Sequence, residues 1–296
     1  MNLLEFILNN KKPILLDGAM ATQLAEAGLE MGGQISITHP DAVLAIHRQY
    51  AECGIDVLIT NTLTMNRVNI ESHHIGVDVR EVNLAGAKLA RAAVRERQYV
   101  LGDIGSTGKM LKPYGNLLEE DAYVAFKEQA ATLAEGGVDG FIIETIFDLR
   151  EALCALRACK EASDLPIIAS IAFNTVKNGG RTIMGNSAQD CGQALSEAGA
   201  CVVGANCGNL DPFQMAEIIS KMRESTSLPI LAQPNAGKPR FVENRTVFDM
   251  SPSDFAAGIY QCLKAGAGLI GGCCGTSPAH IRAVAELLRG GSDNDK

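Results

Sequence analysis

The chain has 296 residues, of which 47% are hydrophobic and 20% charged, a composition typical of a globular protein with a large apolar core. The net charge is −8 with no basic run, which argues against nucleic acid as a partner. No apolar stretch approaches the roughly 20 residues of a membrane span, and the N-terminus lacks the features of a signal peptide. We therefore expect a cytoplasmic protein with reduced thiols and no membrane partner.

Short apolar runs alternate along the chain with Ala-rich amphipathic segments. The runs, predicted as strands, span residues 14–16, 57–60, 100–103, 140–144, 166–171, 201–206, 229–233 and 268–272. Runs that are apolar on both faces suit a parallel sheet covered by helices. The predicted helices span residues 41–53, 79–97, 119–135, 149–162, 188–198, 212–224, 252–264 and 278–288.

Eight strand–helix units at fairly even spacing predict an α/β fold, a (β/α)8 TIM barrel, because right-handed crossovers over that many parallel strands close naturally. An open doubly wound sheet is the alternative, but residues 17–22 lack the G-x-G-x-x-G turn that it would favour. We expect one barrel over residues 1–290 and a disordered tail over residues 291–296. Two long connections, residues 19–38 and 234–250, are expected on the C-terminal rim, where such barrels carry their chemistry.

Three cysteines follow strand ends. Cys207 directly follows the sixth run, and the pair Cys273–Cys274 follows the eighth run between glycines that allow a sharp bend. In a barrel these strand ends lie on the same rim. Three thiolates suit zinc, and three protein ligands leave the fourth position open, as in catalytic zinc sites. A substrate thiol bound there would lose its proton and could attack a methyl group. The remaining cysteines are expected to pack as small hydrophobic residues.

Several motifs resemble the homocysteine S-methyltransferase family, in the order expected for that family. They lie at residues 17–20, 102–107, 204–207, 234–239 and 271–276, and the resemblance extends from about residue 14 to residue 288. Residues 102–107 and 234–239 are most similar to the homocysteine-binding module of the cobalamin-dependent members, whereas the stretch from Asp17 resembles the members that use S-methylmethionine. Leu63 departs from the pattern, because the family commonly carries an aromatic residue there.

The resemblance implies a zinc-dependent transfer of a methyl group to the thiol of homocysteine, giving methionine. It further implies that Asp17 and Glu144 receive the substrate ammonium, although Asp17 could instead cap a loop. The substrate carboxylate needs N–H or hydroxyl donors. Plausible sources of these donors are Gly18, Ala19, Ser106 and Thr107. Asn235 is interpreted either as a hydrogen-bonding residue of the rim or as a turn residue.

The same residues leave other functions open. The methyl donor is either a small molecule or a methyl-corrinoid carried by a separate protein, and in the second case the chain would be a thiol methyltransferase subunit with a different thiol or donor. A Schiff-base aldolase or lyase would need a lysine at a strand end, and none of the eight runs ends in lysine. A phosphate site after the last strand is disfavoured by the two cysteines there. A non-catalytic partner of a corrinoid protein is the remaining alternative.

Overall fold

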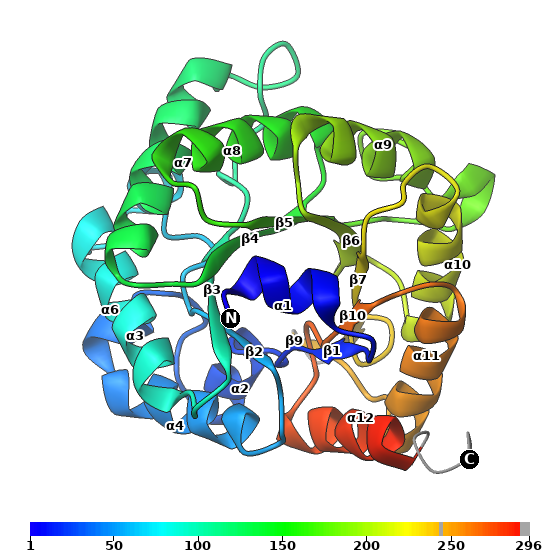
Figure 1. Cartoon of the computed structure of the whole chain (residues 1–296). Coiled ribbons are helices and arrows are strands. Elements are labelled where there is room, and N and C mark those ends of the chain that lie inside the picture. Colours follow the sequence, from blue (N-terminus) through cyan, green and yellow to red (C-terminus); the bar gives the residue numbers. More distant parts are fainter. Residues whose placement is uncertain (243–244, 291–296) are drawn as a thin grey trace.

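Eight parallel strands form a barrel surrounded by helices in the computed structural model, which describes residues 1–242 and 245–290 (Figure 1). The strands are hydrogen-bonded in the order β1-β10-β7-β6-β5-β4-β3-β2, and an isolated parallel bridge between Leu16 and Val57 joins the two ends of this sheet. The predicted (β/α)8 fold is therefore confirmed. The predicted tail, residues 291–296, lies outside the described residues.

The barrel strands correspond to the eight apolar runs. They are β1 (Ile14–Leu15), β2 (Val57–Ile59), β3 (Tyr99–Ile104), β4 (Gly140–Ile146), β5 (Ile167–Ile171), β6 (Val202–Asn206), β7 (Ile230–Gln233) and β10 (Leu269–Ile270). Side chains at every second position point into the barrel, because successive residues of a strand face opposite sides. This inner layer is aliphatic and includes Ile14, Leu16, Val57, Leu101, Ile142, Ile168, Val202, Leu231 and Leu269.

The outer helices also follow the prediction. They are α4 (Pro40–Ala51), α6 (Val79–Ala93), α7 (Glu119–Glu135), α8 (Leu149–Ala162), α9 (Ala188–Ala198), α10 (Pro212–Arg223), α11 (Pro252–Lys264) and α12 (Pro278–Gly290). Most ends agree within two residues. The exception is α6, which stops at Ala93 rather than at residue 97, because Val94 already has extended backbone angles.

One end of the barrel is closed by a helix that the sequence analysis did not predict. Helix α1 (Leu3–Asn9) lies across this end (Figure 1), and its Leu3 and Ile7 pack against the inner aliphatic layer. Asn2 and Glu5 form a capping box that satisfies the first N–H groups of this short helix. Substrates must therefore enter from the opposite end, which is the C-terminal end of the strands.

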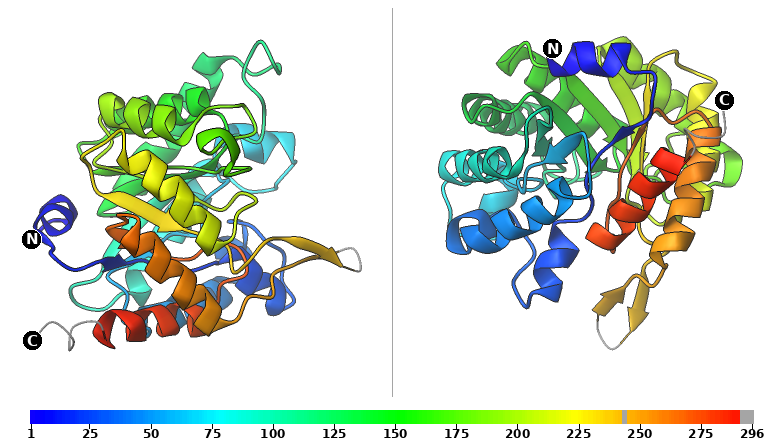
Figure 2. Two further views of the ribbon diagram at one scale, coloured as in Figure 1. Left: turned by 90° about the vertical axis from the view of Figure 1, so that its right-hand side faces the viewer. Right: turned by 60° about the horizontal axis from the view of Figure 1, so that its bottom comes forward.

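The two long connections carry small elements at that opposite end. The first contains α2 (Ala21–Glu26) and α3 (Ile35–Thr38), and the second contains the antiparallel hairpin β8 (Arg240–Val242) and β9 (Arg245–Val247). Figure 2 shows this hairpin projecting from the end of the barrel opposite to α1. The remaining elements are α5 (Arg67–Ser72) and the 3-10 turn η1 (Lys177–Gly179). Within the described ranges, no helix combines the length and the apolar character that crossing a bilayer requires.

Candidate active site

The three cysteines singled out in the sequence come together at the C-terminal end of the barrel. The Sγ atoms of Cys207 and Cys274 are 4.0 Å apart, and the sulfurs of Cys207, Cys273 and Cys274 all lie within 4.8 Å of one another. Cys207 comes directly after β6, and the other two follow β10. The predicted convergence of these segments is therefore observed.

Strand β7 lies between β6 and β10 and holds both cysteine segments. The backbone N–H of Cys207 donates to the carbonyl of Gln233 over 3.1 Å, and that of Cys273 donates to the carbonyl of Pro234 over 2.9 Å. A tight turn follows, in which the N–H of Thr276 donates to the carbonyl of Cys273 and Gly275 has a φ of 79°. A side chain at position 275 would be strained in this conformation and would meet Phe248 at 2.2 Å, so the turn requires glycine.

The sulfur cluster has the donor set of a soft or borderline metal ion. Hydrogen bonds from the Cys207 and Cys273 thiols lower the pKa of Cys274 to about 3, whereas hydrogen bonds to Cys207 and Cys274 raise the pKa of Cys273 well above its usual range. Three thiolates this close repel one another unless a cation lies among them. The three cysteines therefore fit a metal held by thiolates, with the donor number of a catalytic zinc site.

A small cavity of ≈ 120 Å³ lies beside the sulfurs and is lined by buried carboxylates. Asp17, Asp103 and Glu144 all line it, and these residues are only 3%, 5% and 8% exposed. Gly18 and Ala19 also line it, and the N–H of Ala19 donates to the Thr276 hydroxyl over 2.9 Å. Within the part of the chain that the structure describes, no lysine lines this cavity, which removes the support for a Schiff-base enzyme.

Burial dominates the electrostatics of these carboxylates. It raises the pKa of Asp17 well above the usual range, and the charge of Glu144 adds to this effect. Burial also raises the pKa of Glu144 to about 7, with a further contribution from the charge of Cys274. The cavity therefore favours a ligand that brings positive charge and N–H donors.

Glu144 is directed toward the cavity by an irregularity near the end of β4. The pairing of β4 with β5 shifts between Ile143 and Ile146, and Thr145 has a φ of 57°. Asn206 holds this bulge: its Oδ1 accepts from the Thr145 N–H and the Ser170 hydroxyl, and its Nδ2 donates to the Thr145 hydroxyl over 2.7 Å. Because Asn206 directly precedes Cys207, one buried amide positions both the carboxylate and a sulfur.

Replacing Asn206 with alanine should lower the free energy of unfolding by about 2–4 kcal/mol, because the N–H of Thr145 and the hydroxyl of Ser170 lose their acceptor inside the protein. Urea unfolding followed by circular dichroism measures this loss. Ser170→Ala, which removes one hydrogen bond and leaves the bulge held, should lose less. Equal stability of Asn206→Ala and the wild-type protein would contradict the positioning role of Asn206.

Three predicted substrate-binding residues do not line the cavity. The hydroxyls of Ser106 and Thr107 and the N–H of Thr107 all donate to the buried carboxylate of Glu151 on α8. The side-chain N–H of Asn235 donates to the carbonyl of Gly208 over 3.0 Å. Glu151 therefore takes up both hydroxyls and the Thr107 N–H, and the role of Ser106 and Thr107 as donors to the substrate carboxylate stays a prediction. Asn235 links two rim loops rather than facing the cavity.

Asp103 and Gln233 are among the lining residues that were not predicted as site residues. Both lie in barrel strands, two positions after Leu101 and Leu231, which point into the barrel. The alternation of strand side chains predicts that Asp103 and Gln233 also point inward. The alternation along each strand therefore carries the signal for both residues.

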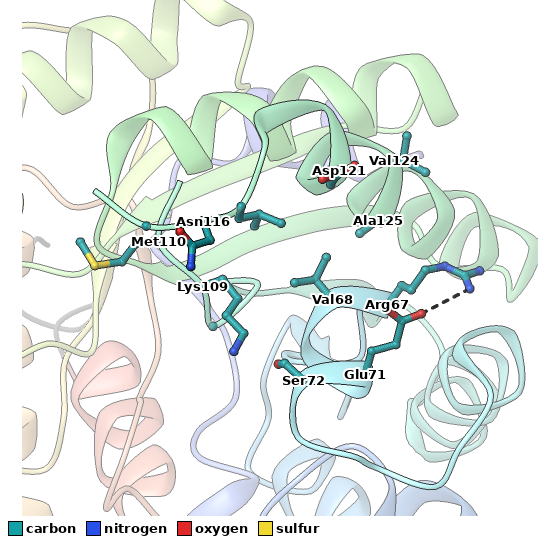
Figure 3. A pocket seen from close by; sticks show the side chains of 13 residues that line it. Arg67, Val68, Glu71, Ser72, Lys109, Met110, Asn116, Asp121, Val124 and Ala125 are labelled. Carbon is teal, nitrogen blue, oxygen red and sulfur yellow. Dashed lines mark ion pairs between the residues drawn. The ribbon is translucent and has the colours of Figure 1, made fainter. Parts of the chain in front are cut away.

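A larger hollow of ≈ 880 Å³ lies elsewhere, between α5, the start of α7 and the loop that follows β3 (Figure 3). Arg67 and Glu71 pair across 3.8 Å on its wall, and Lys109 and Asp121 also line it. Neither the sulfurs nor the buried carboxylates reach it. The chemistry of the side chains therefore assigns the active site to the smaller cavity.

Comparison with known proteins agrees with this assignment. The sequence profile of the homocysteine S-methyltransferase family matches residues 14–288. Over 293 residues, covering 92% of this chain, the sequence is 31% identical to methionine synthase from Mycobacterium tuberculosis and 30% identical to that from Mycobacterium leprae. The match covers 24% of each of these relatives, so the chain spans about a quarter of their length.

Solved structures share the fold. The homocysteine methyltransferase MmuM from Escherichia coli, in its metallated form, superposes with a TM-score of 0.79 at 21% identity, covering 96% of this chain and 99% of that one. The carboxyl transferase domain of pyruvate carboxylase from Rhizobium etli, with pyruvate, is a more distant match, with a TM-score of 0.56 at 16% identity over 98% of this chain and 49% of that one. At these identities the likeness concerns the barrel alone.

Proposed function

Because this chain belongs to the homocysteine S-methyltransferase family, we propose that it transfers a methyl group to the thiol of homocysteine, giving methionine, with zinc held by Cys207, Cys273 and Cys274. The observation that carries the proposal is the meeting of three sulfurs within 4.8 Å beside a cavity lined by buried carboxylates. The three sulfurs bind a soft metal ion, and the buried carboxylates bind an amino group. We further propose that residues 1–290 act as a single homocysteine-binding barrel.

The residues of the site divide the chemistry between them. Bound zinc would supply a Lewis acid that keeps a coordinated thiol ionised near neutral pH. Asp17 and Glu144 bind the substrate ammonium and orient the amino acid, so that its sulfur lies toward the cysteines. The new carbon–sulfur bond forms as the bond between the methyl group and the donor breaks, and the leaving group departs with the bonding electron pair. The thiol proton passes to water before the transfer, so no side chain has to act as a general base during it.

The methyl donor is part of the proposal. We propose that the donor is either a small methylated molecule or a methyl-corrinoid protein. The barrel end opposite to α1 is where the donor must approach, since α1 closes the other end.

The test is a donor screen on purified protein of known zinc content. We expect about one zinc ion per chain and methionine formation from homocysteine with S-methylmethionine, S-adenosylmethionine, a betaine or a methyl-corrinoid protein. Removal of zinc with a chelator should abolish the activity, and added zinc should restore it. Undiminished methyl transfer by the metal-free protein would contradict the proposed role of the cysteines.

A further inference from the structure

Asp103 is a third buried carboxylate in the cavity, with no part in the mechanism described above. It lies in β3, lines the same cavity as Asp17 and Glu144, and is 5% exposed. Among the described residues, its Oδ1 atom finds no hydrogen-bond partner. Burying a carboxylate oxygen without a hydrogen-bond partner costs free energy of folding, so the presence of Asp103 in the cavity needs an explanation.

The backbone of Asp103, in contrast, is fully engaged. Its N–H donates to the hydroxyl of Thr60 over 2.9 Å, and its carbonyl accepts from the hydroxyl of Thr62 over 2.8 Å. Those two hydroxyls are 2.6 Å apart, and Gln129 donates to the carbonyl of Thr62 over 2.8 Å. This network fixes the main chain at Asp103 rigidly and leaves its carboxylate directed at the cavity.

Glu151 shows how this protein treats a buried carboxylate with a structural role. It is 4% exposed, close to the value for Asp103. Its two oxygens accept hydrogen bonds from the side chains of Ser106 and Thr107 and from the N–H of Thr107. Asp103 has similar burial and no equivalent set of donors, so structural anchoring does not account for its side chain.

The unpaired oxygens in the cavity match a particular ligand group. In the described part of the chain, three carboxyl oxygens of the lining, Asp17 Oδ1, Asp103 Oδ1 and Glu144 Oε2, are buried without partners, and so is the uncharged amide oxygen of Gln233. No lysine, arginine or histidine lines the cavity in that part of the chain. A primary ammonium carries one positive charge and three N–H donors, which suits three carboxyl oxygens around it.

We propose that Asp103 is a third ligand of the substrate ammonium and makes the site selective for thiols that carry a protonated primary amine. The inference rests on the proposed function, since it concerns the same cavity. Asp17 binds the ammonium from the segment after β1 and Glu144 from β4, and Asp103 adds a contact from β3, which neighbours β4. A thiol without the amino group would leave all three oxygens unpaired, and the site should discriminate strongly against it.

Calorimetric titration of the zinc-loaded protein with homocysteine, and with 4-mercaptobutanoic acid as the analogue lacking the amino group, tests the proposal without any methyl donor. We expect Asp103→Asn to weaken homocysteine binding by about ten- to a hundredfold and to leave binding of the analogue nearly unchanged. Its zinc content and thermal midpoint should not fall. Glu151→Gln is the matched control and should lower the thermal midpoint without this selective effect.

The outcomes separate the two proposals. Equal losses for both thiols in Asp103→Asn, or a drop in thermal midpoint like that of Glu151→Gln, would show that Asp103 is structural and would overturn the inference. Tighter or equal binding of the analogue by the wild-type protein would overturn it too, while leaving methyl transfer to a thiol intact. If the wild-type protein binds neither thiol and makes no methionine, the proposed function itself fails, and the inference fails with it.

Discussion

Replacing Cys207 with serine should abolish metal binding and slow methyl transfer by about 10³-fold or more. Without the metal, the substrate thiol returns to its ordinary pKa of ~8.5, so that only a few per cent is ionised at neutral pH. Positioning of the sulfur is lost as well, and positioning alone is worth several orders of magnitude in rate. The two effects multiply, which makes this the largest change that a single substitution in the chain should cause.

Metal analysis and steady-state kinetics on the same preparations measure both parts of this prediction. Cys262→Ser is the matched control, because Cys262 is a buried cysteine of α11 whose thiol donates to the carbonyl of Pro212, away from the cluster. It should keep its zinc. Serine at position 207 changes one atom and so preserves the volume of the side chain, which keeps a folding defect from mimicking metal loss. Full zinc content in Cys207→Ser would refute the three-cysteine site.

Much of the architecture could be read from local patterns. Eight aliphatic runs and eight amphipathic segments predicted the strand and helix positions, since burial on two faces or on one face leaves a periodic trace in the sequence. The segments that escaped detection are short. Helix α1 has seven residues, and its Leu3 and Ile7 become meaningful only once the barrel end that they cover exists. Strands β8 and β9 have three residues each, too few to show a period.

The part of the site whose chemistry comes from one residue type could be predicted from the sequence. The role of a residue remained uncertain where it depends on which distant residue it forms hydrogen bonds with. Three cysteines at strand ends indicated a metal site without further context. Ser106 and Thr107 looked like substrate-binding donors, and only the structure reveals that Glu151, 44 positions beyond Thr107, takes up their hydrogen bonds. The unusual φ of Thr145 likewise depends on the amide of Asn206, which is 61 residues away in sequence. Such long-range partners leave no local pattern.

Replacing Glu144 with glutamine should weaken homocysteine binding by about a hundredfold, because a buried charged hydrogen-bonding partner of the ammonium is lost. The same substitution should change how stability depends on pH. Burial, followed by the charge of Cys274, raises the pKa of Glu144 from 4.5 to about 7 in the folded protein. Between these two values the folded protein holds a proton that the unfolded chain has released.

The sign of the effect follows from this difference in bound protons. Stability from the protonated carboxyl is fully present below pH 4.5 and is lost as the pH rises through 7, a total of about 3 kcal/mol. Glutamine cannot titrate, so the difference in unfolding free energy between the wild-type protein and Glu144→Gln should shift in favour of the variant by that amount between pH 4.5 and pH 8. Urea unfolding of both proteins, metal-free and reduced, at several pH values measures this shift.

Glu120→Gln provides the control, because Glu120 is exposed in the first turn of α7 and its substitution should preserve the wild-type pH dependence. A parallel pH dependence of Glu144→Gln and the wild-type protein would mean that Glu144 is ionised throughout and is already paired in the free protein. A carboxylate that gains stability only by protonation has no partner of its own inside the fold. Glu144 therefore weakens the folded protein at neutral pH and is stabilised when the substrate ammonium binds. Its cost to folding and its contribution to substrate selectivity both arise from the burial of an unpaired carboxylate.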